Sequence, residues 1–303
     1  MGRLAGLALG LGALALAGCG ASAAPAGSST SSPPSGGAPD LVWVTAGDPS
    51  AYGCAVLSAA RRAAQADGLA LEVRTASTPV AQVGALNAAM GEHARAVVLD
   101  ALPDRDVALA VRFAHDQQTP VVLANRPPGG DPGFAWTVVS GPDAAVGRQA
   151  AATLATRLGA RAPTIVVVTA GYADATRAAA FSAAVHGRGM TPPPTVTITE
   201  PATATAVITA YLHAHPAVRG IFAADAPAAT AAASAHVAVV GADASTDELR
   251  LLADGALADV IAADAEHEGA VAIAEAVAAS HHVVHRRPDL PVHALTPSDA
   301  RTC

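Results

Sequence analysis

Polar and charged side chains recur directly after the apolar runs of this sequence. The positions are Asp48, Asp100, Asn125, Arg126, Asp225, Asp243 and Asp264. Carboxylates accept hydrogen bonds, an asparagine amide both donates and accepts them, and an arginine presents a planar fork of donors. Such groups can hold a small hydroxyl-rich ligand without any covalent step. Their recurrence is therefore the first indication of a binding site.

Motifs for covalent chemistry are absent from the sequence. Ser140-Gly141 and Thr169-Ala170-Gly171 match neither a phosphate-binding loop nor a nucleophile elbow. His281 and His285 have the spacing of metal ligands on a helix, but the pattern offers no third ligand nearby. We therefore expect a protein that is not an enzyme and that uses no cofactor and no metal.

The composition fits an α/β protein with a large aliphatic core. Of the 303 residues, 51% are hydrophobic but only 3% are aromatic, so alanine, valine, leucine and isoleucine must fill the interior. This length is enough for about two domains. The net charge of −7, without a basic run, argues against a nucleic-acid partner.

Short apolar runs alternate with longer alanine-rich segments from Asp40 onward. Strands are expected at 41–46, 69–76, 94–101, 120–126, 137–140, 164–170, 195–200, 218–225, 236–243 and 256–264. Helices are expected at 55–68, 79–92, 108–118, 144–159, 177–189, 204–215, 226–235, 246–254 and 266–282. Continuously apolar strands separated by helices indicate parallel sheets covered on both faces. Because the rhythm restarts near residue 140, we expect two α/β lobes that bind ligands beyond the carboxyl ends of their strands.

The N-terminal segment has the features of an export signal. Arg3 supplies a positive charge, and the apolar run Leu4–Ala17 is too short for a comfortable transmembrane helix. The run ends in Leu16-Ala17-Gly18-Cys19, which resembles the lipobox of bacterial lipoproteins. A plain secreted protein with a chance cysteine is the alternative.

The lipobox resemblance implies how the chain is anchored. Residues 1–18 would be a lipoprotein signal peptide, and Cys19 would be acylated and become the mature N-terminus. Residues 19–39, rich in Gly, Ser and Pro, would form a disordered linker. The folded part would then lie on the extracytoplasmic face of the cell membrane, held by lipid.

From about residue 40 to 295 the chain resembles the type I periplasmic binding proteins, in particular the ribose-like sugar-binding branch of ABC importers. The segments that carry the resemblance are colinear: ALNAAMGEHARAVVLDALPDRDVALAVRFAHDQQTPVVLANRPP, VSGPDAAVGRQAAATLA, YLHAHPAVRGIFAADAPAA and VAVVGADASTDELRLLADGALADVIAAD. The resemblance implies two Rossmann-like lobes with parallel sheets, joined by three hinge crossings near residues 140, 263 and 290. The N-terminal lobe would hold 40–140 plus 264–289, and the C-terminal lobe 141–263 plus 290–303.

The same resemblance implies a set of ligand-binding residues. They are Asp48 and Tyr52 in the first-strand loop, Asn125 and Arg126 at the family's Asp-Arg pair, Arg177, Asp225 after a strand, and Asp243 in the family's aspartate turn. Alternative roles also fit the pattern. The two late aspartates can cap helices, the arginines can lie on the surface, and the tyrosine can be a core residue.

Three family positions are changed in this chain. The family's glutamine near the second crossing appears as Ala263, and the second member of its Asn-Asp pair appears as Ala226. The aromatic residue after strand 195–200 is replaced by Glu200-Pro201-Ala202. At most one aromatic face remains for a sugar ring, so the sequence indicates a small polar, carbohydrate-like ligand or a protein that has lost its original ligand.

Two cysteines remain beside Cys19. An exported domain lies in an oxidising environment, where a cysteine pair tends to bond. We hypothesise a disulfide between Cys54 and Cys303 that fixes the C-terminal tail to the first helix. Two separate thiols are the alternative.

These expectations combine into one function. The sequence predicts a monomeric, membrane-tethered solute-binding lipoprotein of an ABC importer, which captures its solute between two lobes and delivers it to a permease. The alternative is a ligand-sensing lipoprotein that signals to a membrane receptor.

Overall fold

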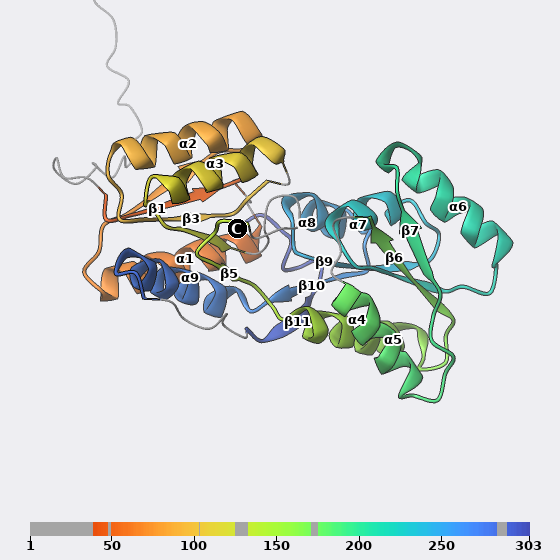
Figure 1. Ribbon diagram of the computed structural model, residues 1–303. Helices are drawn as coiled ribbons and strands as arrows, with labels where there is room; N and C mark the ends of the chain where they lie inside the picture. The colour runs from red at the N-terminus through yellow and green to blue at the C-terminus, as the bar shows by residue number, and fades with distance from the viewer. Residues whose placement is uncertain (1–38, 48–49, 103, 125–132, 171–174, 284–289) are drawn as a thin grey trace, which may run out of the picture. The chain divides into compact units, whose positions relative to one another are not determined.

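A computed structural model describes residues 39–47, 50–102, 104–124, 133–170, 175–283 and 290–303. Residues 38–303 form one compact unit. Its described strands make two sheets, one of five strands and one of six (Figure 1).

The first sheet is entirely parallel, in the order β2-β1-β3-β4-β5. Its strands are β1 (Leu41–Thr45), β2 (Leu71–Thr75), β3 (Ala96–Leu99), β4 (Val121–Ala124) and β5 (Thr137–Val139). Every residue of β1, β3 and β4 except Thr45 is a buried apolar residue, which explains why these strands are continuous apolar runs in the sequence.

Helices cover both faces of the first sheet (Figure 1). On one face lie α1 (Ala51–Ala66) and α9 (Ala265–Ser280), and on the other lie α2 (Pro79–Gly91) and α3 (Arg105–Asp116). Strand alternation divides the core between the faces, because Leu41 and Trp43 join the cluster under α1 while Val42 and Val44 join the cluster under α2 and α3.

The second sheet has the order β11-β10-β9-β8-β6-β7. Its strands are β6 (Thr164–Thr169), β7 (Thr195–Ile198), β8 (Gly220–Ala223), β9 (Ala238–Ala242), β10 (Asp259–Ala263) and β11 (Val292–Leu295). All pairs are parallel except β10 with β11, which is antiparallel. The expectation of parallel sheets therefore holds for every described strand but this edge strand, which the sequence pattern did not predict.

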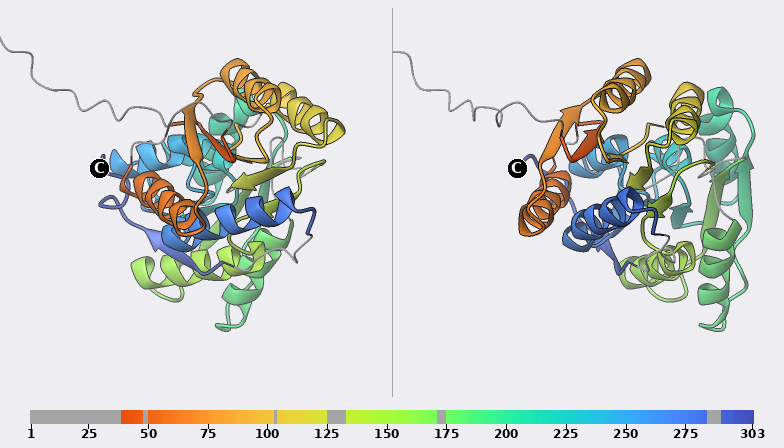
Figure 2. Two further views of the ribbon diagram at one scale, coloured as in Figure 1. Left: turned by 90° about the vertical axis from the view of Figure 1, so that its left-hand side faces the viewer. Right: turned by 60° about the vertical axis from the view of Figure 1, so that its left-hand side comes forward.

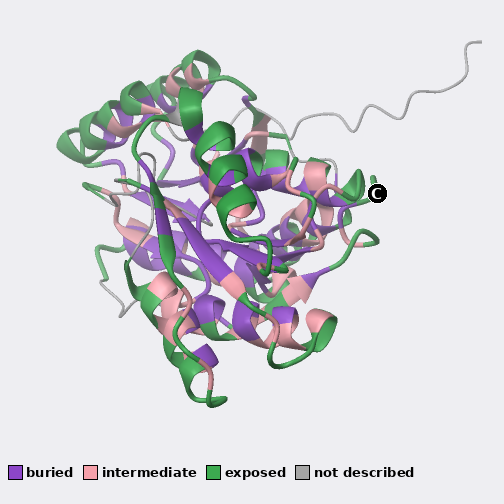
Figure 3. Ribbon diagram, turned by 90° about the vertical axis from the view of Figure 1, so that its right-hand side faces the viewer, coloured by how far each residue is buried: buried purple, intermediate pink, exposed green. Residues whose placement is uncertain are grey.

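Helices α4 (Asp143–Leu158) and α5 (Ala175–His186) cover one face of the second sheet. Helices α6 (Ala204–Ala214), α7 (Ala226–Ala232) and α8 (Thr246–Ala253) cover the other, and a 3-10 turn, η2 (Pro201–Thr203), precedes α6. Phe181 of α5 stacks on Phe222 of β8 with ring centroids 4.9 Å apart. Coloured by burial, the strands are largely buried and the helices turn exposed faces outward (Figure 3).

Capping residues start several helices at the ends of strands. Ser50 caps α1, so this helix begins four residues before the predicted start, and Asp264 caps α9. Ser245 and Glu248 form a reciprocal capping box at the start of α8. These caps place helix N-termini at the carboxyl edges of both sheets.

Helices α1 and α9 lie side by side beneath the first sheet (Figure 2). Gly269 permits this approach, because a Cβ atom there would lie 2.1 Å from the carbonyl oxygen of Val56. The C-terminal tail also reaches α1: Ala51 and Tyr52 donate their amide protons to the carbonyl oxygens of Arg301 and Asp299, at 2.7 and 3.1 Å. The start of α1 is therefore fixed by the far end of the chain.

Candidate ligand-binding site

A cavity of about 420 Å³ lies between the two sheets. On the side of the first sheet, the cavity is lined by residues at the ends of β1, β3 and β4 and by residues of α1 and α9. On the side of the second sheet, it is lined by the ends of β6 and β7, by the segment after β9, and by the first residues of α6, α7 and α8. The parallel strands have the same order in both sheets: β1 lies between β2 and β3, and β6 lies between β7 and β8. The cavity thus lies beyond the carboxyl ends of the strands, where open α/β sheets bind ligands.

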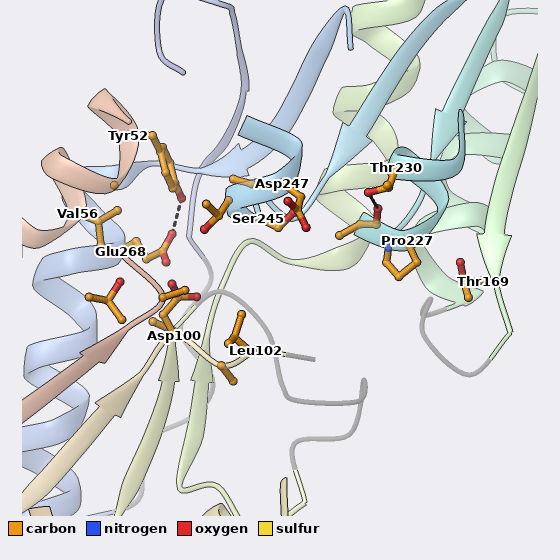
Figure 4. A pocket seen from close by; sticks show the side chains of 18 of the residues that line it. Tyr52, Val56, Asp100, Leu102, Thr169, Pro227, Thr230, Ser245, Asp247 and Glu268 are labelled. Carbon is orange, nitrogen blue, oxygen red and sulfur yellow. Dashed lines mark hydrogen bonds between the residues drawn. The ribbon is translucent and has the colours of Figure 1, made fainter. Parts of the chain in front are cut away.

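Tyr52, Asp100 and Glu268 form a polar wall on the side of the first sheet, hereafter the first wall (Figure 4). The Tyr52 hydroxyl donates a hydrogen bond of 2.5 Å to Oε2 of Glu268. Glu268 is only 3% exposed. Burial raises the pKa of Glu268 to about 8, the Tyr52 hydrogen bond opposes this rise, and the charge of Asp100 adds to it.

The opposite side of the cavity, hereafter the second wall, consists mainly of small side chains. Thr169, Thr230, Ser245 and Asp247 supply its polar atoms (Figure 4). Alanines occupy much of the remainder, at positions 204, 226, 231 and 244. Ala226 is one of the family positions that had changed in the sequence, and it lines the cavity at the first residue of α7.

Arg177 and Asp243 are close together, but neither lines the cavity. The Nη1 atom of Arg177 donates to Oδ1 of Asp243 at 2.5 Å and to the carbonyl oxygen of Ala224 at 3.0 Å. Its Nε atom donates to Oδ1 of Asp143 at 2.7 Å. Burial alone would lower the pKa of Arg177, but the two carboxylates outweigh it and hold the pKa above its ordinary value. The structure thus places Arg177 in an ion cluster behind the second wall.

Asp225 is buried and caps α7, as the alternative interpretation of the sequence expected. Its Oδ1 accepts hydrogen bonds from the Ala228 amide and the Thr169 hydroxyl, both at 2.8 Å. Its Oδ2 accepts one from the Thr169 amide at 2.7 Å. Burial raises the pKa of Asp225, while the bonds to Thr169 and Ala228 oppose the rise. Asp225 thereby joins the end of β6 to the start of α7 and does not line the cavity.

The remaining expected residues divide into three groups. Tyr52 lines the cavity, and its role in ligand binding stays a prediction. Cys19, Asp48, Asn125 and Arg126 lie outside the described residues. The structure joins Cys54 of α1 and Cys303 of the tail as a disulfide, with Cα atoms 6.5 Å apart.

The sequence did not indicate Glu268 as a site residue, and the ligand-binding set implied by the family resemblance did not include Asp100. Asp100 carried the right signal, because it directly follows β3. Glu268 lies one turn into the helix that follows β10, so extending the search past the strand ends into the first helical turn would have included it.

Within the described ranges, no group of three or more His, Cys, Asp or Glu residues could hold a metal ion. Over the same ranges, no helix combines the length and the apolar character needed to cross a membrane.

Comparison with known proteins identifies the fold. Residues 41–281 match the sequence model of a family described as periplasmic binding protein domain. No curated protein sequence matches the chain significantly.

Several solved structures share the fold. An arabinose-binding protein from Geobacillus stearothermophilus has a TM-score of 0.64 and 19% identity, covering 86% of this chain and 97% of its own. A periplasmic ribose ABC transporter protein from Conexibacter woesei has a TM-score of 0.60 and 20% identity, covering 87% and 94%. An ABC transporter solute-binding protein from Bacillus halodurans, solved with myo-inositol, has a TM-score of 0.57 and 16% identity, covering 88% and 97%.

Proposed function

Since this chain belongs to the periplasmic binding protein family, we propose that it is a solute-binding protein of an ABC importer that captures a small polar, carbohydrate-like solute. The solute would bind in the cavity between the two sheets and be delivered to a membrane permease. Binding free energy, rather than catalysis, would drive closure of the lobes around it.

The cavity is the observation that carries this proposal. Its volume of about 420 Å³ lies within the range of small-molecule sites. Both sheets contribute to its walls, so a bound solute would contact both and favour their closed arrangement. The fold neighbours named for arabinose, ribose and myo-inositol support a carbohydrate-like solute.

The test is a binding screen of the chain from residue 20 onward. Thermal shift and calorimetry against monosaccharides, polyols and nucleosides should identify at least one ligand that stabilises the fold. A protein with intact circular dichroism that responds to none of them would contradict the proposal.

We also propose that Cys19 is acylated and tethers the protein to the extracytoplasmic face of the cell membrane. The support is the Leu16-Ala17-Gly18-Cys19 motif after an apolar run. In a bacterial host that processes lipoproteins, the full chain should incorporate labelled fatty acid and sediment with membranes. Cys19→Ala should abolish both, while Cys303→Ser, which leaves the motif intact, should abolish neither.

A further inference from the structure

The described lining of the cavity carries an uneven charge. Asp100, Asp247 and Glu268 contribute three carboxyl groups, and no arginine or histidine is among the described lining residues. Asp100 and Glu268 lie together on the first wall, and Figure 4 shows Asp247 across the cavity from them. Asp247 is exposed and pairs with Arg250 at 3.9 Å, so buried Glu268 is the described carboxyl group of the lining that can favour a positively charged ligand group.

Glu268 is the residue placed to meet such a group. It comes from the first turn of α9, is 3% exposed, and faces the cavity beside Tyr52 (Figure 4). Among the described residues, the Tyr52 hydroxyl is the one hydrogen-bond donor to its carboxyl group, and it binds Oε2. The Oε1 atom accepts no hydrogen bond within that part of the chain. A buried carboxylate is costly unless a cation or further donors pair with it.

We infer that the solute carries a protonated amine, which donates hydrogen bonds to Glu268 on the first wall while its hydroxyl groups contact the rest of the cavity. The chemical class is thus an amino sugar or an aminated polyol rather than a neutral sugar. This inference rests on the proposed solute-binding function and narrows its ligand class. The small side chains of the second wall leave room for the remainder of the ligand.

The inference implies that binding is coupled to proton release. Before binding, Glu268 faces the acidic Asp100 and the hydroxyl of Tyr52, with Asp247 across the cavity, and no described cation lines this space. Asp264 and His267, on its own helix, pair with each other. Burial and the charge of Asp100 raise the pKa of Glu268 to about 8, so the protonated form of this residue is favoured before binding. A bound ammonium group would favour the carboxylate, so the proton would leave as the ligand enters.

The experiment uses matched pairs of solutes that differ only in an amine: glucosamine with glucose, 1-amino-1-deoxyglucitol with glucitol, and an inosamine with myo-inositol. Calorimetry on the chain from residue 20 onward should give tighter binding of the amine in at least one pair. For 1-amino-1-deoxyglucitol, calorimetry in buffers of different ionisation enthalpy should show proton release. Its affinity should rise by up to about tenfold per pH unit between pH 6 and 8.

Substitution of Glu268 supplies the residue-level test. Glu268→Gln keeps the side-chain shape and an acceptor for Tyr52, and should weaken amine binding by about thirtyfold or more, so that the preference for the amine over its neutral partner is lost. Glu266→Gln is the matched control, because Glu266 lies in the same helical turn but is exposed and pairs with Arg62. Its affinity should equal that of the wild type.

The outcomes separate the two proposals. If a neutral solute binds at least as tightly as its amine in every pair, the amine inference is overturned and the solute-binding proposal stands. If the amine binds more tightly but without proton release and without dependence on Glu268, the inference is also overturned. If no member of any pair binds to folded protein, both proposals are contradicted for this ligand class.

Discussion

Replacing Arg177 with methionine tests whether this arginine holds the second lobe together or binds ligand. Its guanidinium lies between Asp143 and Asp243, with donor–acceptor distances of 2.7 and 2.5 Å. The side chains of Arg177, Asp143 and Asp243 are 13%, 16% and 8% exposed. Methionine keeps the apolar stem but removes the guanidinium that these two largely buried carboxylates share.

The structure sets the expected size of the effect. Removing one partner of a buried ion pair costs about 3–5 kcal/mol of the free energy of unfolding, because the remaining charge stays buried. For a domain of this size, each kcal/mol lowers Tm by roughly 2–4 °C. Arg177→Met should therefore lower Tm by roughly 6–20 °C, and adding Asp143→Asn and Asp243→Asn should restore part of the loss.

Urea denaturation followed by circular dichroism, together with thermal melting, measures this change. Arg62→Ala is the control, since Arg62 pairs with Glu266 at 3.2 Å on the surface, where an ion pair contributes at most about 1 kcal/mol. Suppose that the free energy of unfolding of Arg177→Met lies within 1 kcal/mol of the wild-type value, but that the variant no longer binds the solute. Arg177 would then be a ligand-binding residue, as the sequence resemblance implies, and its assignment to a structural ion cluster would be refuted.

Three further predictions concern stability. Gly269→Ala should lower the free energy of unfolding by about 2–4 kcal/mol or prevent folding, because the new Cβ would lie 2.1 Å from a carbonyl oxygen of α1. Gly84→Ala, whose Cβ would have nothing within 4 Å, should instead stabilise α2 by about 0.5–1 kcal/mol. Urea denaturation measures both changes. The fold raises the pKa of Glu268 to about 8, so its protonated form is favoured in the folded state. The free energy of unfolding of the wild type should therefore fall relative to that of Glu268→Gln by at most about 1.4 kcal/mol per pH unit as pH rises from about 5 to 8. A difference in free energy that does not change with pH across this window would contradict the buried carboxyl group. Reduction of the Cys54–Cys303 disulfide, which spans 249 residues, should lower the free energy of unfolding by up to about 5 kcal/mol, and mass spectrometry of the unreduced mature protein showing two free thiols would disprove the bond.

Most of the fold could be predicted from the sequence because the strands are covered on both faces. Runs such as 41–44 and 121–124 are wholly buried, so their apolar residues stand out without alternation. The start of α1 could not be placed, because Ala51 and Tyr52 are held there by the tail near residue 300. Strand β11 has only four residues, and its Val292 and Ala294 are partly exposed, so the sequence shows no clear strand pattern there. Contacts that are distant in sequence decided both cases.

The site was less predictable than the fold. The rule that ligands lie beyond strand ends indicated Asp100, and the family resemblance indicated Tyr52; both line the cavity. The rule could not separate Glu268 from Glu266, two residues earlier, because only the packing of α9 on α1 determines which of them faces inward. Nor could the sequence show that Asp143, at the start of α4, pairs with Arg177.

Placement of the polar groups behind the second wall explains the asymmetry of the cavity. The resemblance assigns Arg177, Asp225 and Asp243 to ligand binding, yet each is hydrogen-bonded to partners behind the second wall. Alanines face the cavity in front of them, so this wall contributes shape more than hydrogen bonds. Recognition of polar atoms then falls mainly to the first wall, where the disulfide and the tail fix the start of α1 and hence Tyr52. We therefore expect the solute to engage Tyr52 and Glu268 through its amine and the second wall through its hydroxyl groups.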